Sequence, residues 1–196
     1  MHMKTLIIYN HPHEGSFCSA IRDAVMTGLQ TGGHAHKLIN LDADGFDPVM
    51  REKDLAAFVE GGKHEGMYIE GIDPLVRSYI DKMRWAERIV MIFPVWWMST
   101  PAMTKGFIDK VIFPGMVYRM EGRKLVSMLT RLKQVVIITT MNTPAAIYET
   151  SFRPSILYTI PGNMTLSMKP LVMAGVLIHQ MGKIITMRSA QRILSM

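Results

Sequence analysis

The hydrophobic pattern along the chain changes repeatedly between two forms. Short runs with a continuous apolar interior occupy residues 5–10, 87–95 and 133–140, and a more polar run occupies 34–41. Such runs are typical of strands that are buried on both faces of a sheet. The segments between them carry apolar residues at helical spacing. The pattern therefore predicts alternating strands and helices.

The helices have recognisable ends. The first follows residue 16 and ends at Thr31-Gly32-Gly33. A short helix is expected near 53–60, and two longer helices open at Asp73-Pro74 and Thr100-Pro101, where a capping residue precedes a proline. The positions expected to face inward are Ala20, Ile21, Ala24, Val25, Gly28, Leu29, Val76, Tyr79, Ile80, Met83, Met103, Phe107 and Val111.

Towards the C-terminus, a helix over 163–174 that stops at Gly175 and a fifth strand over 176–185 complete the pattern. Strands alternating with helices predict an α/β fold with a parallel sheet covered on both faces. Five strands suit a flavodoxin-like three-layer sandwich of strand order 2-1-3-4-5, formed by one domain over residues 1–196. In that fold a ligand binds at the carboxyl ends of strands 1 and 3.

Composition narrows the class of protein. The chain has 196 residues, of which 48% are hydrophobic and 19% charged, as in ordinary globular domains. The single cysteine, Cys18, excludes an intrachain disulfide and suits a reducing cytosol. No signal-peptide pattern opens the chain, and the longest apolar run, 89–98, is too short to span a bilayer. We expect a cytoplasmic protein.

Charge is unevenly distributed. Residues 1–100 hold 10 Lys and Arg against 13 Asp and Glu, or −3, whereas 101–196 hold 12 against 3, or +9. A basic half attracts phosphate-bearing cofactors, nucleic acid or acidic lipid, or is only a solvated face. Its basic residues are scattered and not interleaved with aromatic ones, so no nucleic-acid partner is expected.

Three loops follow the ends of the predicted central strands. The first, HPHEGSF, leads from His11 into a helix N-terminus, where free amides and a partial positive charge suit a phosphate. Ser16 adds a hydroxyl that either binds the phosphate or only caps the helix. Because the loop is neither GxGxxG nor GxxxxGK, a dinucleotide Rossmann loop and a P-loop are disfavoured.

The second loop, Pro94-Val95-Trp96-Trp97-Met98, offers flat apolar walls and backbone amides that suit a planar heteroaromatic ligand. Adjacent residues leaving a strand point in different directions, so we expect at least one tryptophan to face a ligand or a partner subunit. The third loop, Thr139-Thr140-Met141-Asn142-Thr143-Pro144, supplies hydroxyl and amide groups. Tyr148 follows it and either donates a proton or only packs.

Other candidate sites are weaker. His11-x-His13 and His34-x-His36 resemble pairs of metal ligands, but no further cluster completes a site, so no metal is expected. Cys18 has no paired base in the sequence, which favours packing over nucleophilic attack.

Longer stretches of the chain resemble a known family. LIIYNHPHEGSF, FDPVM, the block from Asp73 to Tyr118 and VVIITTMNTP are similar to segments of the flavodoxin-like NAD(P)H:quinone oxidoreductases. That group contains mammalian quinone reductases, bacterial modulators of drug activity and ancillary proteins of potassium efflux. The resemblance covers roughly residues 4–148.

The resemblance implies roles for particular residues. Residues that match positions on the flavin's phosphate-bearing chain are His11, Phe17 and Cys18, with Ser16 beside them. Two segments match positions along the isoalloxazine ring, namely Val95, Trp96, Trp97 and Met98, and Thr139, Thr140, Met141 and Asn142; Pro94, which precedes the first of them, is a further cofactor-binding candidate. Tyr148 is the candidate for the family's active-site tyrosine.

The resemblance also implies an activity. It predicts an enzyme that passes hydride from NAD(P)H via FMN, or alternatively FAD, to quinone-like acceptors by a ping-pong mechanism, as a homodimer with its sites at the subunit interface. An alternative is a flavin-binding regulatory subunit that contacts a membrane transporter. A one-electron flavodoxin carrier is a third possibility, but such carriers are usually acidic and lack the PVWW block.

Overall fold

A four-stranded parallel sheet forms the centre of the protein. A computed structural model describes residues 3–63, 70–97 and 99–141. Strands β1 (Thr5–Tyr9), β2 (His36–Asn40), β3 (Arg88–Pro94) and β6 (Gln134–Thr140) pair in the order β2-β1-β3-β6, all parallel. This matches the first four positions of the predicted order. The predicted helix at 163–174 and the fifth strand at 176–185 lie outside the described residues, so a five-stranded order is not established.

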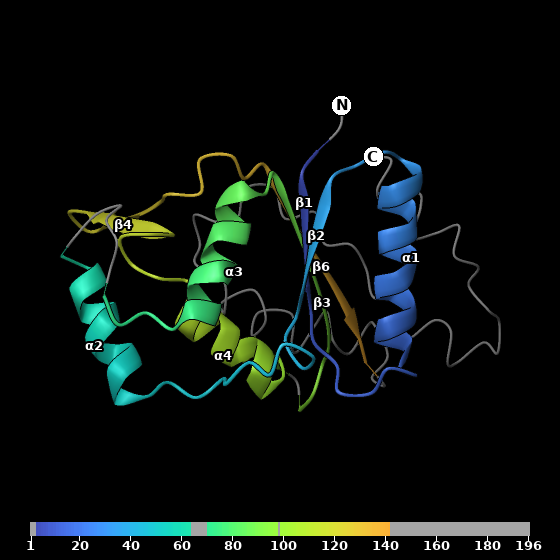
Figure 1. The fold of residues 1–196 in the computed structure, drawn as a ribbon, viewed down its shortest axis with the longest axis horizontal. Helices are drawn as coiled ribbons and strands as arrows, with labels where there is room; N and C mark the ends of the chain where they lie inside the picture. The colour runs from blue at the N-terminus through green and yellow to red at the C-terminus, as the bar shows by residue number, and fades with distance from the viewer. Residues whose placement is uncertain (1–2, 64–69, 98, 142–196) are drawn as a thin grey trace.

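Helices cover both faces of the sheet (Figure 1). On one face, helix α1 (Phe17–Thr31) packs Val25 and Leu29 against Ile7 and Ile92. On the other face lie α3 (Pro74–Trp85) and α4 (Ala102–Val111), whose inner side chains surround Leu6 and Ile8 of β1. The predicted three-layer arrangement is therefore present in the described part of the chain.

The inward-facing positions follow the predicted pattern with one clear exception. Val76, Tyr79, Ile80 and Met83 of α3 are all buried. In α1, Ala20 is exposed, and the buried positions of the first turn are Cys18 and Ser19 instead.

The two predicted helix starts differ. The Asp73 carboxylate accepts a hydrogen bond from the Leu75 amide, so Asp73 caps α3 as expected. The prediction for Thr100 is wrong, because α4 begins at Ala102 and Pro101 occupies the capping position. The Thr100 hydroxyl is buried and finds no partner among the described residues. It lies one residue before the cap, where a side chain does not reach back to the first amides.

Helix α2 (Glu52–Gly61) and the segment before it pack on the α4 side of the molecule. Gly106 of α4 allows this approach, because a β-carbon there would lie 2.3 Å from the Pro48 carbonyl oxygen. Lys110 of α4 donates to the carbonyl oxygens of Asp47 and Val49. The FDPVM segment at 46–50 is thus fixed directly to α4.

A β-hairpin that the hydrophobic pattern did not predict lies apart from the central sheet. Strands β4 (Tyr118–Glu121) and β5 (Lys124–Ser127) pair antiparallel around Gly122-Arg123. Gly122 has a φ of 60°, a conformation that glycine adopts without steric cost.

In the described ranges, none of the helices has the length and apolar character needed to cross a bilayer.

Candidate functional site

The three predicted loops leave the sheet at the same edge. Because the strands are parallel, β1, β3 and β6 all end there, with Tyr9 beside Ile92 and Pro94 beside Thr140. Two further backbone bonds continue the ladders past the strand ends: the Asn10 amide donates to Ile92 at 3.0 Å and the Val95 amide to Thr140 at 2.8 Å. We call this edge, where the strands end, the carboxyl edge of the sheet.

Residues 11–16 form a compact turn that ends in the cap of α1. The His13 amide donates to Nδ1 of His11 at 3.1 Å, so the neutral His11 ring carries its proton on Nε2. Ser16 is the N-cap of α1, and its hydroxyl accepts from the Ser19 amide at 3.1 Å. Since a helix cannot bond its own first amides, those of Phe17 and Cys18 remain available at this end. Ser16 therefore caps the helix, as one of the two interpretations predicted.

The tryptophan loop is a tight turn. Trp96 and Ser99 exchange backbone hydrogen bonds of 3.0 and 3.1 Å. Trp97, within the turn, has a φ of 46°, which is rare for a bulky residue and marks a strained position. Its side chain is 96% exposed and that of Trp96 is 46% exposed, so neither tryptophan is a core residue. The side chain of Met98 lies outside the described residues.

Two contacts join the three loops to one another. The rings of His11 and Trp96 meet edge to face, with centroids 6.1 Å apart and planes at 67°. The Cys18 thiol lies 3.1 Å from the Thr140 hydroxyl, which links the first turn of α1 to the end of β6. The sequence-predicted segments after β1, β3 and β6 are therefore close neighbours.

Several predicted site residues contribute little side-chain surface. Pro94 and Thr139 are buried in the sheet, and Met141 is buried in the core on the α3 side. Cys18 is also buried, and burial raises the pKa of its thiol, partly offset by the hydrogen bond with Thr140. These four residues form the floor of the edge, whereas His11, Phe17, Trp96 and Trp97 stand above it. Asn142 and Tyr148 lie outside the described residues.

A buried polar group that sequence reasoning missed fixes the carboxyl edge. Asn10 is 2% exposed; its side-chain amide nitrogen donates to Asp42 at 2.7 Å and its oxygen accepts from Thr104 at 2.9 Å. It thereby ties the start of the His11 turn to the segment after β2 and to α4. A polar residue at the end of an apolar strand was the available signal, but its partners were not identifiable from the sequence.

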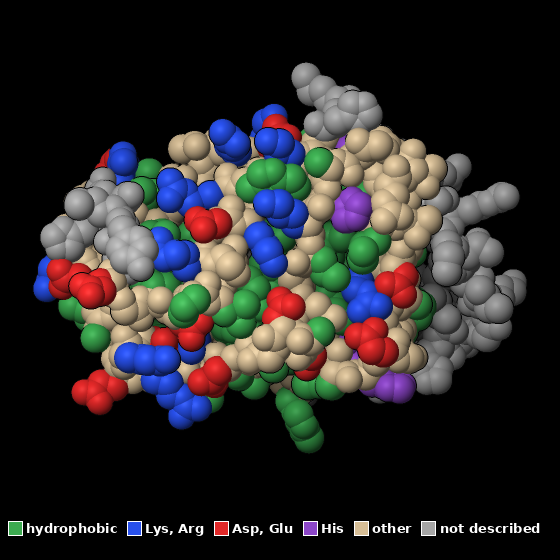
Figure 2. All heavy atoms as spheres, in the orientation of Figure 1, with side chains coloured by type: hydrophobic (Ala, Val, Ile, Leu, Met, Phe, Trp, Pro, Cys, Tyr) green, Lys and Arg blue, Asp and Glu red, His purple; other side chains and the backbone are tan. Residues whose placement is uncertain are grey.

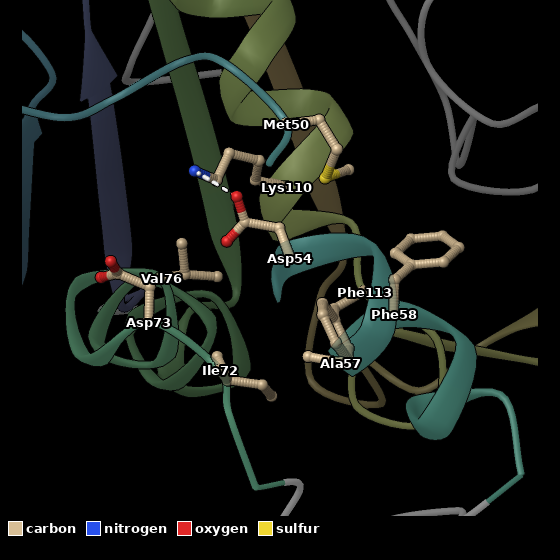
Figure 3. Close-up of a pocket in the computed structure, with 9 residues that line it drawn as sticks. All are labelled: Met50, Asp54, Ala57, Phe58, Ile72, Asp73, Val76, Lys110 and Phe113. Atoms are coloured by element: carbon tan, nitrogen blue, oxygen red, sulfur yellow. Dashed lines mark ion pairs between the residues drawn. The ribbon is translucent and has the colours of Figure 1, made fainter. Parts of the chain in front are cut away.

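A small hollow lies away from these loops and holds a buried ion pair (Figure 3). A carboxylate oxygen of Asp54 (α2) lies 3.0 Å from Nζ of Lys110 (α4), beside Phe58, Ile72 and Phe113. The volume of this cavity is about 10 Å³, which leaves room for roughly one water. This hollow is too small for a cofactor. Among the described residues, no group of three or more His, Cys, Asp or Glu side chains is arranged to hold a metal.

Comparison with known proteins places the chain in a family. A sequence model described as "Flavodoxin-like fold" matches residues 3–161. The chain belongs to this flavodoxin-like family. A Haemophilus influenzae protein named as an uncharacterized NAD(P)H oxidoreductase is 29% identical over 128 residues, covering 65% of this chain and 59% of that protein. A Penicillium crustosum protein named as ribosyldihydronicotinamide dehydrogenase-like is 28% identical over 121 residues, covering 56% and 43%.

Solved structures share the fold of this chain. A Streptococcus mutans protein is 28% identical with a TM-score of 0.68, and the alignment covers 98% of this chain and 95% of that one. An NAD(P)H:quinone oxidoreductase from Methanothermobacter marburgensis is 20% identical with a TM-score of 0.74, covering 98% and 93%, and supports the fold. The chain spans about half the length of the curated relatives named above.

Proposed function

We propose that this protein is a flavin-dependent NAD(P)H oxidoreductase that reduces quinone-like acceptors. The observation that carries the proposal is the meeting of three strand-end loops at the carboxyl edge, where a half-exposed tryptophan stands beside a helix N-terminus. The names of relatives support the same chemistry, since they include NAD(P)H oxidoreductase and quinone dehydrogenase.

The turn before α1 fits the phosphate end of a flavin. The amides of Phe17 and Cys18 have no intrahelical acceptor, and the helix dipole favours an anion there. His11 adds an Nε2–H donor because its Nδ1 already accepts from the His13 amide. The Ser16 hydroxyl keeps its cap bond with the Ser19 amide and so fixes the end of this turn.

The loops after β3 and β6 fit the ring of a flavin. Trp96 offers an apolar face at the carboxyl edge, and the end of β6 at Thr140 brings a hydroxyl to the same edge. A flavin bound here supplies the hydride chemistry between a nicotinamide and an acceptor. The chain's own residues bind it, orient it and exclude water from one face.

FMN is the cofactor that we propose, with FAD as the alternative. An FMN-dependent NADH-azoreductase from Bacillus anthracis, solved in complex with FMN, shares the fold, with a TM-score of 0.55 at 18% identity. For proton delivery we propose Tyr148, which follows the third loop in the sequence. The 96% exposure of Trp97 supports a homodimer in which a second copy covers this ring.

An absorption spectrum of the purified protein tests the proposal, followed by mass analysis of the released chromophore. Steady-state oxidation of NADH and NADPH with a soluble quinone then tests the activity, and parallel double-reciprocal lines are expected for a ping-pong mechanism. A protein that binds neither FMN nor FAD contradicts the proposal. Retained flavin without oxidation of either nucleotide would instead favour the regulatory-subunit alternative.

A further inference from the structure

Cations gather near Trp85 at the opposite edge of the sheet, where the strands begin, and two of them lie over its ring. Lys37 of β2 places its ammonium 4.7 Å from the centre of the Trp85 ring, and Lys4, just before β1, places its own at 5.8 Å. Lys82 and Arg84 belong to the last turn of α3, which ends at Trp85. We call Lys4, Lys37, Lys82, Arg84 and Trp85 the basic cluster.

The basic cluster brings together cations that have no ion-paired carboxylate in the described chain. Some lysines and arginines elsewhere do pair with carboxylates, as in Arg22 with Glu14 and Lys105 with Asp109. Within the described ranges no carboxylate is ion-paired with a cation of the basic cluster. The Lys82 ammonium donates to the Leu38 carbonyl oxygen at 3.3 Å and lies over the Tyr79 ring.

The nearby carboxylates offset only part of the charge of the basic cluster. Glu87 follows α3; it pairs with Lys133 at 2.6 Å, accepts from the Lys4 amide and is also attracted by the charge of Lys4. Asp81 is exposed on α3 between cations. Figure 2 shows lysine and arginine side chains gathered over α3 and the beginnings of the strands. The electrostatic potential at this edge is therefore positive. The edge lies one strand length, about 17 Å, from the carboxyl edge.

From these features we propose that the basic cluster is a docking surface for an anionic phospholipid bilayer. Charge complementarity with phosphate headgroups is the main attraction, and each lysine or arginine near such a surface strengthens binding by about fivefold. Lysine stems lying along an indole ring suit the boundary between headgroups and acyl chains, where tryptophan is enriched.

The same features disfavour nucleic acid. A protein that binds single-stranded nucleic acid exposes aromatic faces on which the bases stack. The Trp85 ring is instead half-buried and lies beneath the ammonium groups of Lys4 and Lys37. A structural explanation also exists, since lysines on an edge strand such as β2 prevent pairing with other chains. Docking at this edge leaves the carboxyl edge open to soluble substrates.

Vesicle co-sedimentation of the full-length protein tests the inference. The probes are phosphatidylcholine vesicles, with and without 30 mole per cent phosphatidylglycerol as an experimental choice, at low and high salt. We expect at least tenfold stronger binding to the anionic vesicles, and loss of that binding at high salt. Equal binding to both vesicle types, or none to either, overturns the inference.

Two triple variants then localise the surface. Lys4→Gln/Lys37→Gln/Arg84→Gln removes three charges from the basic cluster, whereas Lys53→Gln/Arg123→Gln/Lys124→Gln removes three exposed charges elsewhere. The first variant is expected to weaken vesicle binding by about a hundredfold, because it removes three charges that each contribute about fivefold at the bilayer surface. The second is expected to weaken binding much less, because its charges lie away from the proposed docking surface. Equal losses in the two variants overturn the inference.

Size-exclusion chromatography and circular dichroism of both variants identify a folding or association defect. Wild-type binding to the two vesicle types decides the question if the cluster variant fails to fold. Should the wild type bind a 30-nucleotide DNA or an acidic protein through the same cluster but not anionic vesicles, the lipid assignment is wrong. If the cluster variant associates into oligomers while vesicle binding is unchanged, the edge-protecting role is the correct one.

Discussion

The thiol of Cys18 lies 3.1 Å from the hydroxyl of Thr140, although 122 positions separate the two residues in the chain. This contact joins the first turn of α1 to the last residue of β6 at the carboxyl edge. It holds together the two segments that we assign to the tail and the ring of a flavin.

The buried thiol is expected to react slowly. Burial raises the pKa of Cys18 more than the Thr140 hydrogen bond lowers it, so little thiolate forms at neutral pH. A thiol reagent at pH 8 should label the native protein many times more slowly than the protein in urea. Thr140→Val removes the hydrogen bond and should leave labelling slow. Immediate labelling of the native wild type would contradict the buried position.

Trp96 is expected to contribute to flavin binding. Removing its ring in Trp96→Ala loses an aromatic face and the contact with His11, which should cost about 1–2 kcal/mol, or roughly tenfold in the dissociation constant. Quenching of FMN fluorescence measures this. Trp85→Phe, at the opposite edge, serves as the control and should bind normally. Equal affinity of wild type and Trp96→Ala would show that this ring does not face the cofactor.

Gly106 should not tolerate a side chain. A β-carbon there would lie 2.3 Å from the Pro48 oxygen and 2.5 Å from its α-carbon, both backbone atoms that cannot move alone. Gly106→Ala should therefore lower the free energy of unfolding by about 1–3 kcal/mol in urea titrations. At Gly62 the nearest atom to a β-carbon is 3.4 Å away, so Gly62→Ala is the matched control and should change stability little.

The ion pair of Lys110 and Asp54 should show strong coupling. Its side chains are only 5% and 8% exposed, so Lys110→Met leaves the carboxylate buried and unpaired. We expect a loss of about 3–5 kcal/mol in the free energy of unfolding. The double variant Lys110→Met/Asp54→Leu should lose less than the sum of the two single variants. Additive losses would mean that the two charges do not stabilise each other.

Tyr79 should make stability fall at high pH. Burial, then the 2.7 Å hydrogen bond to Asp44 and the charge of that carboxylate, raise the pKa of the phenol well above its usual value. As pH rises past about 10, the unfolded chain loses this proton first, so the free energy of unfolding falls by at most about 1.4 kcal/mol per pH unit.

Urea titrations between pH 8 and pH 11 measure this slope. The pKa values of Cys18 and Tyr118 are also raised, so Tyr79→Phe should reduce the slope without abolishing it. An unchanged slope in Tyr79→Phe would contradict the assignment.

The sequence predicted most of the described fold because buried parallel strands are continuous apolar runs. Each of β1, β3 and β6 lies within one residue of its predicted limits. The hairpin at 118–127 was missed because its strands have four residues each and are half-exposed, without a clear alternation. Asp73-Pro74 and Thr100-Pro101 look alike in sequence, yet only Asp73 caps a helix. The tight turn from Trp96 to Ser99 precedes Thr100, whose hydroxyl is buried instead.

The candidate site was predictable in place but not in detail. A parallel sheet requires that its strands end at one edge, so the meeting of the three loops followed from topology. Whether a side chain stands above that edge or lies in the floor depends on packing, as Met141 and Trp97 show. The hydrogen bond from Thr104 to Asn10 joins residues 94 positions apart, and no local pattern encodes it.

The hydrogen bond from the Val95 amide to the Thr140 carbonyl has an evolutionary consequence. Its two atoms belong to the main chain, so amino-acid replacement at either position leaves the bond intact unless proline enters at 95. Descendants of this gene can therefore exchange the neighbouring side chains, and with them the choice of reactant, while the framework beneath keeps its shape.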